Sequence, residues 1–293
     1  MLSGAALALL RDVYGRPDLF AGKPRVNRRI VKWGEQEPAV LPHDAVIVSG
    51  ADLQRELARD ARTVPPAGAC NLTIFAASPI PDENQLVFGD RTGNAARVTL
   101  HSDAAAEECR MEALTAGWLF LVPEGAEKGW LLGIGAPLAE LLAESRLIAP
   151  VLTLEDGAAH PFATAPRLSM PLAGEDWLAC GTPALRFDPI CGDGTAQAVR
   201  EAVLASAVVG GIAAGGERTA LLVHYRSMLV AAMRRHLDLC ARFYAAGGQG
   251  EWWRAQTAAL VQGYEACTAI LARMPEPRFV LRGLALERRS AAA

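Results

Sequence analysis

The sequence predicts a mixed α/β fold with a largely antiparallel sheet in its middle and long helices at its C-terminal end. Between residues 70 and 135, short runs of strand-forming residues alternate with turns. Two of these runs, residues 117–122 and 129–134, are separated by a short turn, which is typical of a hairpin. Residues 217–244 and 251–274 carry apolar side chains at the spacing of amphipathic helices.

Helices are predicted where apolar residues recur at helical spacing between start and stop signals. Ser3 is a suitable N-cap for the first helix, which Gly15 ends. Leu53 and Leu57 share one face of the second. The fourth is rich in alanine and valine, which indicates burial. In order, the predicted helices are residues 5–13, 52–62, 138–146, 195–209, 217–244 and 251–274.

Strands are predicted from short β-branched and aromatic runs that end at glycine, proline or polar residues. Val46, Ile47 and Val48 form one such run, and Trp177 begins another. In order, the predicted strands are residues 25–33, 45–49, 71–76, 96–101, 117–122, 129–134, 177–180 and 279–286.

Composition excludes several classes of function. The net charge of −3 gives no basic surface for nucleic acid. The six cysteines form no CxxC pair, so neither zinc nor any other metal is expected. No apolar run is long enough to predict a membrane span, and the first ten residues lack the features of a secretory signal. We therefore expect a cytoplasmic protein with free thiols.

Residues 177–209 carry the most information about function. A predicted strand ends at Gly181, a loop with Asp188 and the glycines Gly192 and Gly194 follows, and a helix opens at Thr195. Free amides at a helix N-terminus attract negative charge, and glycines let a ligand approach the backbone. The stretch therefore predicts a site for a planar, partly anionic ligand. The alternative is a tight loop ahead of a core helix.

This stretch resembles the second FAD-contacting motif of flavin-dependent monooxygenases and flavin halogenases. The resemblance implies a hydroxybenzoate-hydroxylase type of fold, FAD as cofactor, and a helix start beneath the flavin ring. More narrowly, the chain resembles the flavoproteins that mature quinone-cofactor amine oxidases. The residues that the resemblance assigns to the cofactor are Gly181, Thr182, Asp188, Pro189, Gly192, Asp193, Gly194 and Thr195. For Asp193 an N-cap role is the alternative.

A second match lies at residues 117–123, which resemble a halogenase strand that faces the substrate pocket. The resemblance implies that Trp118, Phe120 and Pro123 line that pocket. The alternative is an ordinary core strand with two aromatic residues.

The sequence departs from the family pattern at three places that hold FAD. No GxGxxG motif follows a strand near its start, Gly50 stands where the family has a cofactor-contacting arginine, and Thr182 replaces the aspartate of a Gly-Asp pair. We therefore expect a reduced, Rossmann-like FAD-binding half that lacks the first βαβ unit. The expected domains are residues 1–69 and 165–215 for this remnant, 70–164 for the antiparallel substrate sheet, and 216–293 for a helical region.

Two functions are compatible with this pattern. The first is an FAD-dependent, monooxygenase-like oxidoreductase acting on an aromatic or peptide-borne substrate. Halogenation fits less well, because no lysine falls at the position that it requires. The second is a flavin-free relative that binds a small molecule, a peptide, or a complete flavoprotein or reductase as partner. Neither function involves nucleic acid or a membrane.

Overall fold

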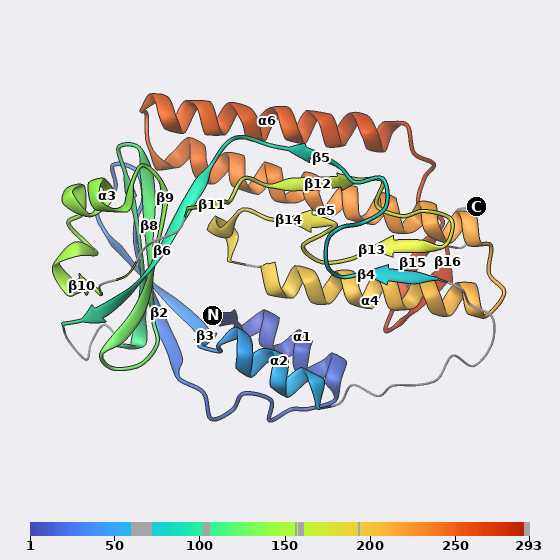
Figure 1. Cartoon of the computed structure of the whole chain (residues 1–293), viewed down its shortest axis with the longest axis horizontal. Helices are drawn as coiled ribbons and strands as arrows, with labels where there is room; N and C mark the ends of the chain where they lie inside the picture. Colours follow the sequence, from blue (N-terminus) through green and yellow to red (C-terminus); the bar gives the residue numbers. More distant parts are fainter. Residues whose placement is uncertain (60–71, 102–105, 156, 158–160, 193, 290–293) are drawn as a thin grey trace.

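The computed structural model describes residues 1–59, 72–101, 106–155, 157, 161–192 and 194–289. Within these residues the chain forms the mixed α/β fold that the sequence predicts, with one large sheet and three long helices (Figure 1).

The large sheet contains nine of the described strands, and all but one of their pairings are antiparallel. The exception is the parallel pair of β2 and β7. Several other elements lie between these two strands in the sequence, because a tight turn cannot join parallel neighbours. From one edge the order is β1 (Leu2–Ser3), β3 (Ala39–Val46), β2 (Arg25–Lys32), β7 (Glu108–Leu114), β8 (Gly117–Pro123), β9 (Lys128–Gly135), β6 (Thr92–Leu100) and β10 (Leu152–Leu154), and β11 (Phe162–Ala163) also pairs with β6.

The hairpin predicted at residues 117–134 is confirmed as β8 and β9, which pair from Gly117–Gly135 to Pro123–Gly129. The sheet also joins β1–β3 to the strands that follow residue 92, so it contains segments from both sides of the domain boundary expected at residue 70.

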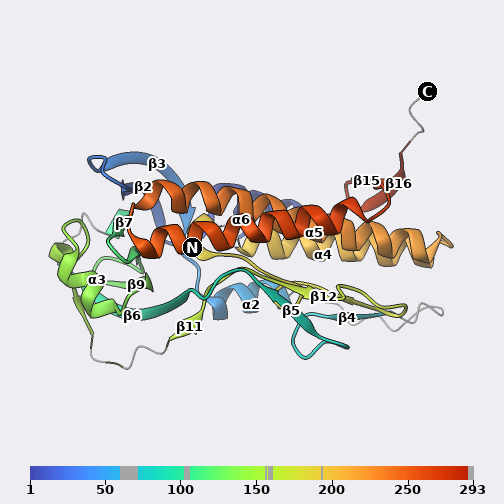
Figure 2. The same cartoon turned by 90° about the horizontal axis from the view of Figure 1, so that it is seen from above.

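Three long helices form the other half of the molecule. They are α4 (Gly194–Ala213), α5 (Arg218–Gly247) and α6 (Glu251–Ala272), and α5 packs along both α4 and α6. Figure 2 shows them on one side of the molecule, with strands β4, β5 and β12 on the other. Their inner faces contribute Tyr225, Tyr244 and Trp253 to the largest hydrophobic core.

The shorter helices are α1 (Gly4–Tyr14), α2 (Gly50–Ala58) and α3 (Leu138–Glu144). Helices α1 and α3 begin and end within two residues of their predicted bounds. Helix α2 begins two residues before and ends four residues before the predicted 52–62, whose residues 60–62 lie outside the described residues. Ser3 caps α1 as predicted, because its hydroxyl accepts a hydrogen bond from the Ala6 amide, and Gly15 ends the helix in a left-handed conformation with φ of 60°.

Two small sheets lie beside the long helices and lead the chain into the α4 region. Strands β14 (Leu185–Arg186), β12 (Arg167–Met170) and β5 (Asn84–Val87) form one, and β4 (Thr73–Phe75) pairs in parallel with β13 (Trp177–Ala179) in the other. The prediction of one strand at residues 279–286 was wrong. The chain turns at Gly283, with φ of 57°, and makes a hairpin of β15 (Phe279–Arg282) and β16 (Ala285–Arg288).

Helix α4 is the one helix of the described chain that is long and apolar enough to span a membrane by length and composition alone. In the fold it packs against α1 and α5, and its inner face is buried.

Candidate functional site

The loop between β14 and α4 is held in place by its own backbone. Asp188 caps the 3₁₀ turn η3 (Pro189–Cys191), since its side chain accepts a hydrogen bond from the Ile190 amide at 3.0 Å. Gly192 then takes a left-handed conformation, with φ of 62°, and its amide donates to Pro189 O. This turn lies directly ahead of α4, which begins at Gly194.

A cavity of about 370 Å³ lies at this end of α4. It is lined by Gly181, Thr182, Leu185, Arg186, Phe187, Asp188, Pro189, Gly192, Gly194, Thr195, Gln197, Ala198 and Glu201. The structure therefore brings together seven of the residues assigned to the cofactor from sequence; Asp193 lies outside the described residues. A Cβ atom added at Gly181, Gly192 or Gly194 would have no neighbour within 4 Å, so the backbone faces open space at all three.

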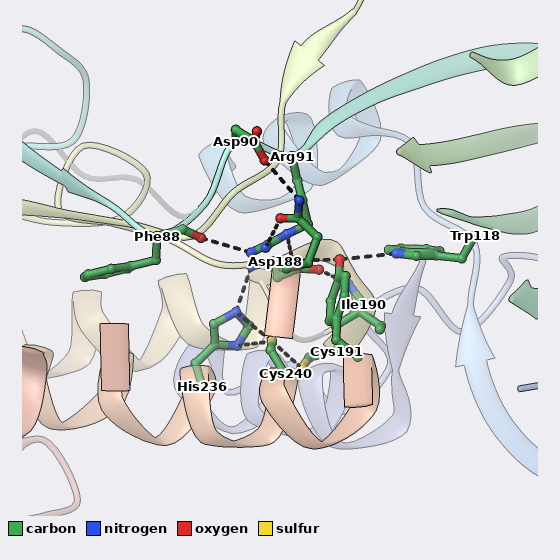
Figure 3. Close-up of polar contacts among 11 residues, drawn as sticks. Phe88, Asp90, Arg91, Trp118, Asp188, Ile190, Cys191, His236 and Cys240 are labelled. Carbon is green, nitrogen blue, oxygen red and sulfur yellow. Dashed lines mark hydrogen bonds and ion pairs between the residues drawn. The ribbon is translucent and has the colours of Figure 1, made fainter. Parts of the chain in front are cut away.

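The carboxylate of Asp188 faces the protein interior, although the residue also borders the cavity. Its Oδ2 accepts hydrogen bonds from Arg91 Nε at 2.9 Å and from the Tyr244 hydroxyl at 3.1 Å (Figure 3). Burial raises the pKa of Asp188, while the Arg91 guanidinium and these donors lower it. The side chain thus anchors the loop from behind.

Glu201 is a cavity residue that the sequence reading did not assign to the site. Its Oε2 accepts a hydrogen bond from the Gly181 amide at 2.8 Å, and its Oε1 accepts one from Gln197 Nε2 at 3.1 Å. Burial raises the pKa of Glu201 to about 7, against the opposing effect of these two donors. The available signal was a single acidic residue within an otherwise Ala/Val-rich helix.

The fold that carries this cavity occurs in known flavoproteins. The flavin-dependent halogenase CmlS superimposes with a TM-score of 0.73 at 14% identity, over 97% of this chain and 67% of that one. The chain has the fold of the flavin-dependent halogenases. The myxobacterial chondrochloren halogenase CndH gives 0.71 at 13% identity, over 94% of this chain and 81% of its own.

A third structure with the halogenase fold is the peptidyl tryptophan dihydroxylase QhpG, which is essential for tryptophylquinone cofactor biogenesis. It superimposes with a TM-score of 0.65 at 16% identity, over 98% of this chain and 77% of its own. No protein-family model and no curated protein matches the sequence. Residues 177–209 predicted a fold shared with flavin halogenases and with flavoproteins of quinone-cofactor maturation. These structural similarities confirm that fold.

The residues at α4 offer groups that suit a planar, anionic ligand. Three glycines open onto the cavity, and the first turn of a 20-residue helix borders it, so unpaired amides and the positive end of the helix dipole are available to an anionic ring. Arg186 adds one cationic side chain to the lining.

The three residues that the family resemblance assigns to a substrate pocket, Trp118, Phe120 and Pro123, lie on β8. Trp118 is fully buried in the core, and its Nε1 donates to the Tyr244 hydroxyl at 3.2 Å. Phe120 is half-buried and Pro123 is buried. None of the three lines the 370 Å³ cavity or the larger one described next, and their substrate role stays a prediction.

A second cavity, of about 590 Å³, is also lined by residues of this loop. It shares Phe187, Gly192 and Gln197 with the first cavity. Strands β2 and β3 contribute Arg29 and His43, and the helices contribute further basic groups. The remaining lining residues are Met1, Ser3, Cys191, Arg200, Ala232, Arg235, His236 and Leu239.

Proposed function

We propose that this chain binds a flavin at the N-terminal end of α4 and serves a monooxygenase-like oxidoreductase reaction. The observation that carries the proposal is the 370 Å³ cavity, in which Gly181, Gly192 and Gly194 present bare backbone beside a helix start. FAD is the proposed form of the cofactor. When bound, a reduced flavin reacts with oxygen and supplies the oxygen atom that such enzymes transfer.

The residues of the chain have separable tasks in this proposal. The amides at Gly194 and Thr195 stabilise negative charge on the ring. The buried pair of Arg91 and Asp188 holds the loop against α5, so that the helix start stays in place.

Glu201 supplies a carboxylate in the cavity where Thr182 lacks one. It lies on α4 and is hydrogen-bonded to the Gly181 amide, so its position is fixed by the loop that precedes Thr182. We propose that Glu201 accepts hydrogen bonds from hydroxyl groups of the bound flavin. A carboxylate bound to a hydroxyl forms a charge-assisted bond, which is stronger than a neutral one.

For the substrate we propose an aromatic group carried by a peptide. The likeness to QhpG, a peptidyl tryptophan dihydroxylase, covers 98% of this chain and supports this choice over a free small molecule. A reductase or a complete flavoprotein is the proposed partner, because the flavin must be reduced before it reacts with oxygen.

The test is a titration of the purified chain with FAD, FMN and riboflavin, followed by flavin fluorescence and visible absorbance. Gly194→Leu places a side chain in the cavity without straining a left-handed backbone. We expect it to weaken binding at least about tenfold, which corresponds to about 1.4 kcal/mol. Gly210→Leu is the matched control, because Gly210 lies on the same helix, also faces open space and is remote from the cavity lining.

A second candidate function has an observation of its own. Gly50 begins α2 and Thr182 lines the cavity, so two positions that hold FAD in the family carry no charge here. The chain would then act as a flavin-free binding protein. Absence of any spectral change with all three flavins, in protein shown to be folded, would favour this function and contradict the first.

A further inference from the structure

A cysteine, a histidine and a second cysteine meet beneath the second cavity. Cys191 ends η3, and His236 and Cys240 lie one turn apart on α5. Cys191 Sγ is 3.6 Å from Cys240 Sγ, and Cys240 Sγ is 3.4 Å from His236 Nε2 (Figure 3). One atom from each side chain lies within 4.8 Å of the other two.

Two of these separations are close to those of a tetrahedral metal centre. Zinc binds sulfur at about 2.3 Å and histidine nitrogen at about 2.0–2.1 Å, so two tetrahedral ligands lie about 3.8 Å apart for two sulfurs and about 3.5 Å for sulfur and nitrogen. The observed distances of 3.6 and 3.4 Å are within a few tenths of an ångström of these values. Cys240 Sγ is also 3.8 Å from His236 Nδ1, so it lies between the two ring nitrogens, and its side chain must rotate for a metal to bind one of them. A disulfide would require the two sulfurs to approach by more than about 1.5 Å, since its bond length is about 2.05 Å.

The chemistry of the three side chains also suits a metal. Histidine nitrogen and thiolate sulfur are both ligands that zinc sites use. A metal ion displaces the proton of each thiol when it binds. Two thiolates then balance a divalent cation, which leaves the buried site without net charge.

One existing contact competes with this arrangement. The Asp188 amide donates a hydrogen bond to His236 Nε2 at 2.7 Å, and a metal at Nε2 would displace it. A single neutral hydrogen bond is much weaker than the set of bonds to zinc, so metal binding prevails.

We propose that Cys191, His236 and Cys240 form a zinc-binding site whose fourth coordination position faces the second cavity. Cys191 and His236 line that cavity, while Cys240 is fully buried behind them. Three protein ligands with one open position is the pattern of a catalytic zinc site, in which water or substrate occupies the fourth place. Arg29 and Arg235 also line the cavity, so the ligand that we infer for the fourth position is anionic, such as a carboxylate.

The test uses the reduced, metal-free full-length chain and cobalt(II) as a spectroscopic substitute for zinc. We expect one Co²⁺ per chain, with a thiolate-to-metal charge-transfer band and the intense visible bands of tetrahedral cobalt, and we expect Zn²⁺ to displace it. Acetate should change the visible bands by entering the fourth position. No flavin is added, so the result is independent of the proposed flavin site.

Variants decide whether these three residues hold the metal. Cys191→Ser and His236→Gln should each weaken Co²⁺ binding at least about tenfold. Cys191 is only half-buried, so its substitution leaves the fold intact, which circular dichroism checks. Cys267→Ser is the matched control, because Cys267 is a buried free thiol on α6 outside the cluster. The inference is overturned by an absence of tetrahedral bands, by bands that persist unchanged in Cys191→Ser, or by a Cys191–Cys240 disulfide that forms in the presence of excess zinc.

Discussion

Arg91 Nε lies 2.9 Å from Asp188 Oδ2, and neither side chain has any exposed surface. The same guanidinium donates to Gln256 Oε1 at 2.8 Å and to Phe88 O at 3.2 Å. Arg91 directly precedes β6 of the large sheet, Asp188 belongs to the loop before α4, and Gln256 lies on α6. This network therefore ties the sheet and the long helices to the candidate site.

Removing the charge of Asp188 tests the importance of this network. Asp188→Asn leaves the Arg91 guanidinium buried without a counterion, so we expect the free energy of unfolding to fall by about 3–5 kcal/mol. Urea unfolding measures it. Asp238→Asn is the control, because Asp238 pairs with Arg242 on the exposed face of α5, and its loss should change stability by no more than about 0.5 kcal/mol. Equal effects of the two substitutions would contradict a special role for the buried pair.

The Tyr244 hydroxyl connects the network to the sheet. It accepts a hydrogen bond from Trp118 Nε1 and donates one to Asp188, so Tyr244→Phe leaves a buried indole N–H without an acceptor. We expect a loss of about 1–3 kcal/mol and a shift in tryptophan fluorescence. Tyr264→Phe on α6 should cost less, because Tyr264 is only half-buried. A smaller loss for Tyr244→Phe than for Tyr264→Phe would disprove the assignment.

Glu201 makes stability depend on pH. Its pKa rises from 4.5 to about 7 in the folded chain, so below pH 4.5 it is protonated in both states. As the pH rises from 4.5 to about 7, the unfolded chain releases its proton while the folded chain keeps it, so the folded state progressively loses about 3 kcal/mol of stability. We expect Glu201→Gln to gain stability relative to the parent between about pH 4.5 and pH 8. Glu265→Gln, at an exposed position on α6, is the control, and the free energy of unfolding of this variant should follow the same pH profile as that of the parent. If the profiles of Glu201→Gln and the parent are parallel, the effect is ruled out.

The left-handed conformation of Gly192 gives a prediction for the loop. Gly192→Ala forces a Cβ into this conformation, although the site has room for the atom, so we expect a loss of about 1–2 kcal/mol. Gly194→Ala is the comparison, because Gly194 also faces open space but does not have a left-handed φ. Thermal unfolding of both variants separates backbone strain from crowding, and equal melting temperatures would refute the role of strain.

The sequence predicted the parts of this molecule that depend on local signals. Caps, glycines and helical spacing located the helices. The order of Gly181, Asp188 and Gly192 indicated a loop ahead of α4, and these residues line a cavity there. Strands β5 and β7 were missed. β5 is short and pairs with the distant β12, and β7 carries the charged residues Glu108, Arg110 and Glu112, so their own composition gives little strand preference.

The contacts between distant residues could not be predicted. Arg91 and Asp188 are 97 residues apart, and Cys191 and Cys240 are 49 apart. The six cysteines are scattered along the sequence, and spacing along the chain indicates a metal site only when its ligands are sequence neighbours, so the sequence predicts no metal. Glu201 was missed for a related reason, since its role depends on a loop that precedes it by 20 residues.

The residues Phe187, Gly192 and Gln197 face both cavities and so form a common wall between them. A molecule that presses on this wall from one chamber changes the shape of the other. By thermodynamic linkage, any such change in affinity is the same in both directions. We therefore expect a ligand bound in one cavity to change the affinity of the other cavity for its own ligand.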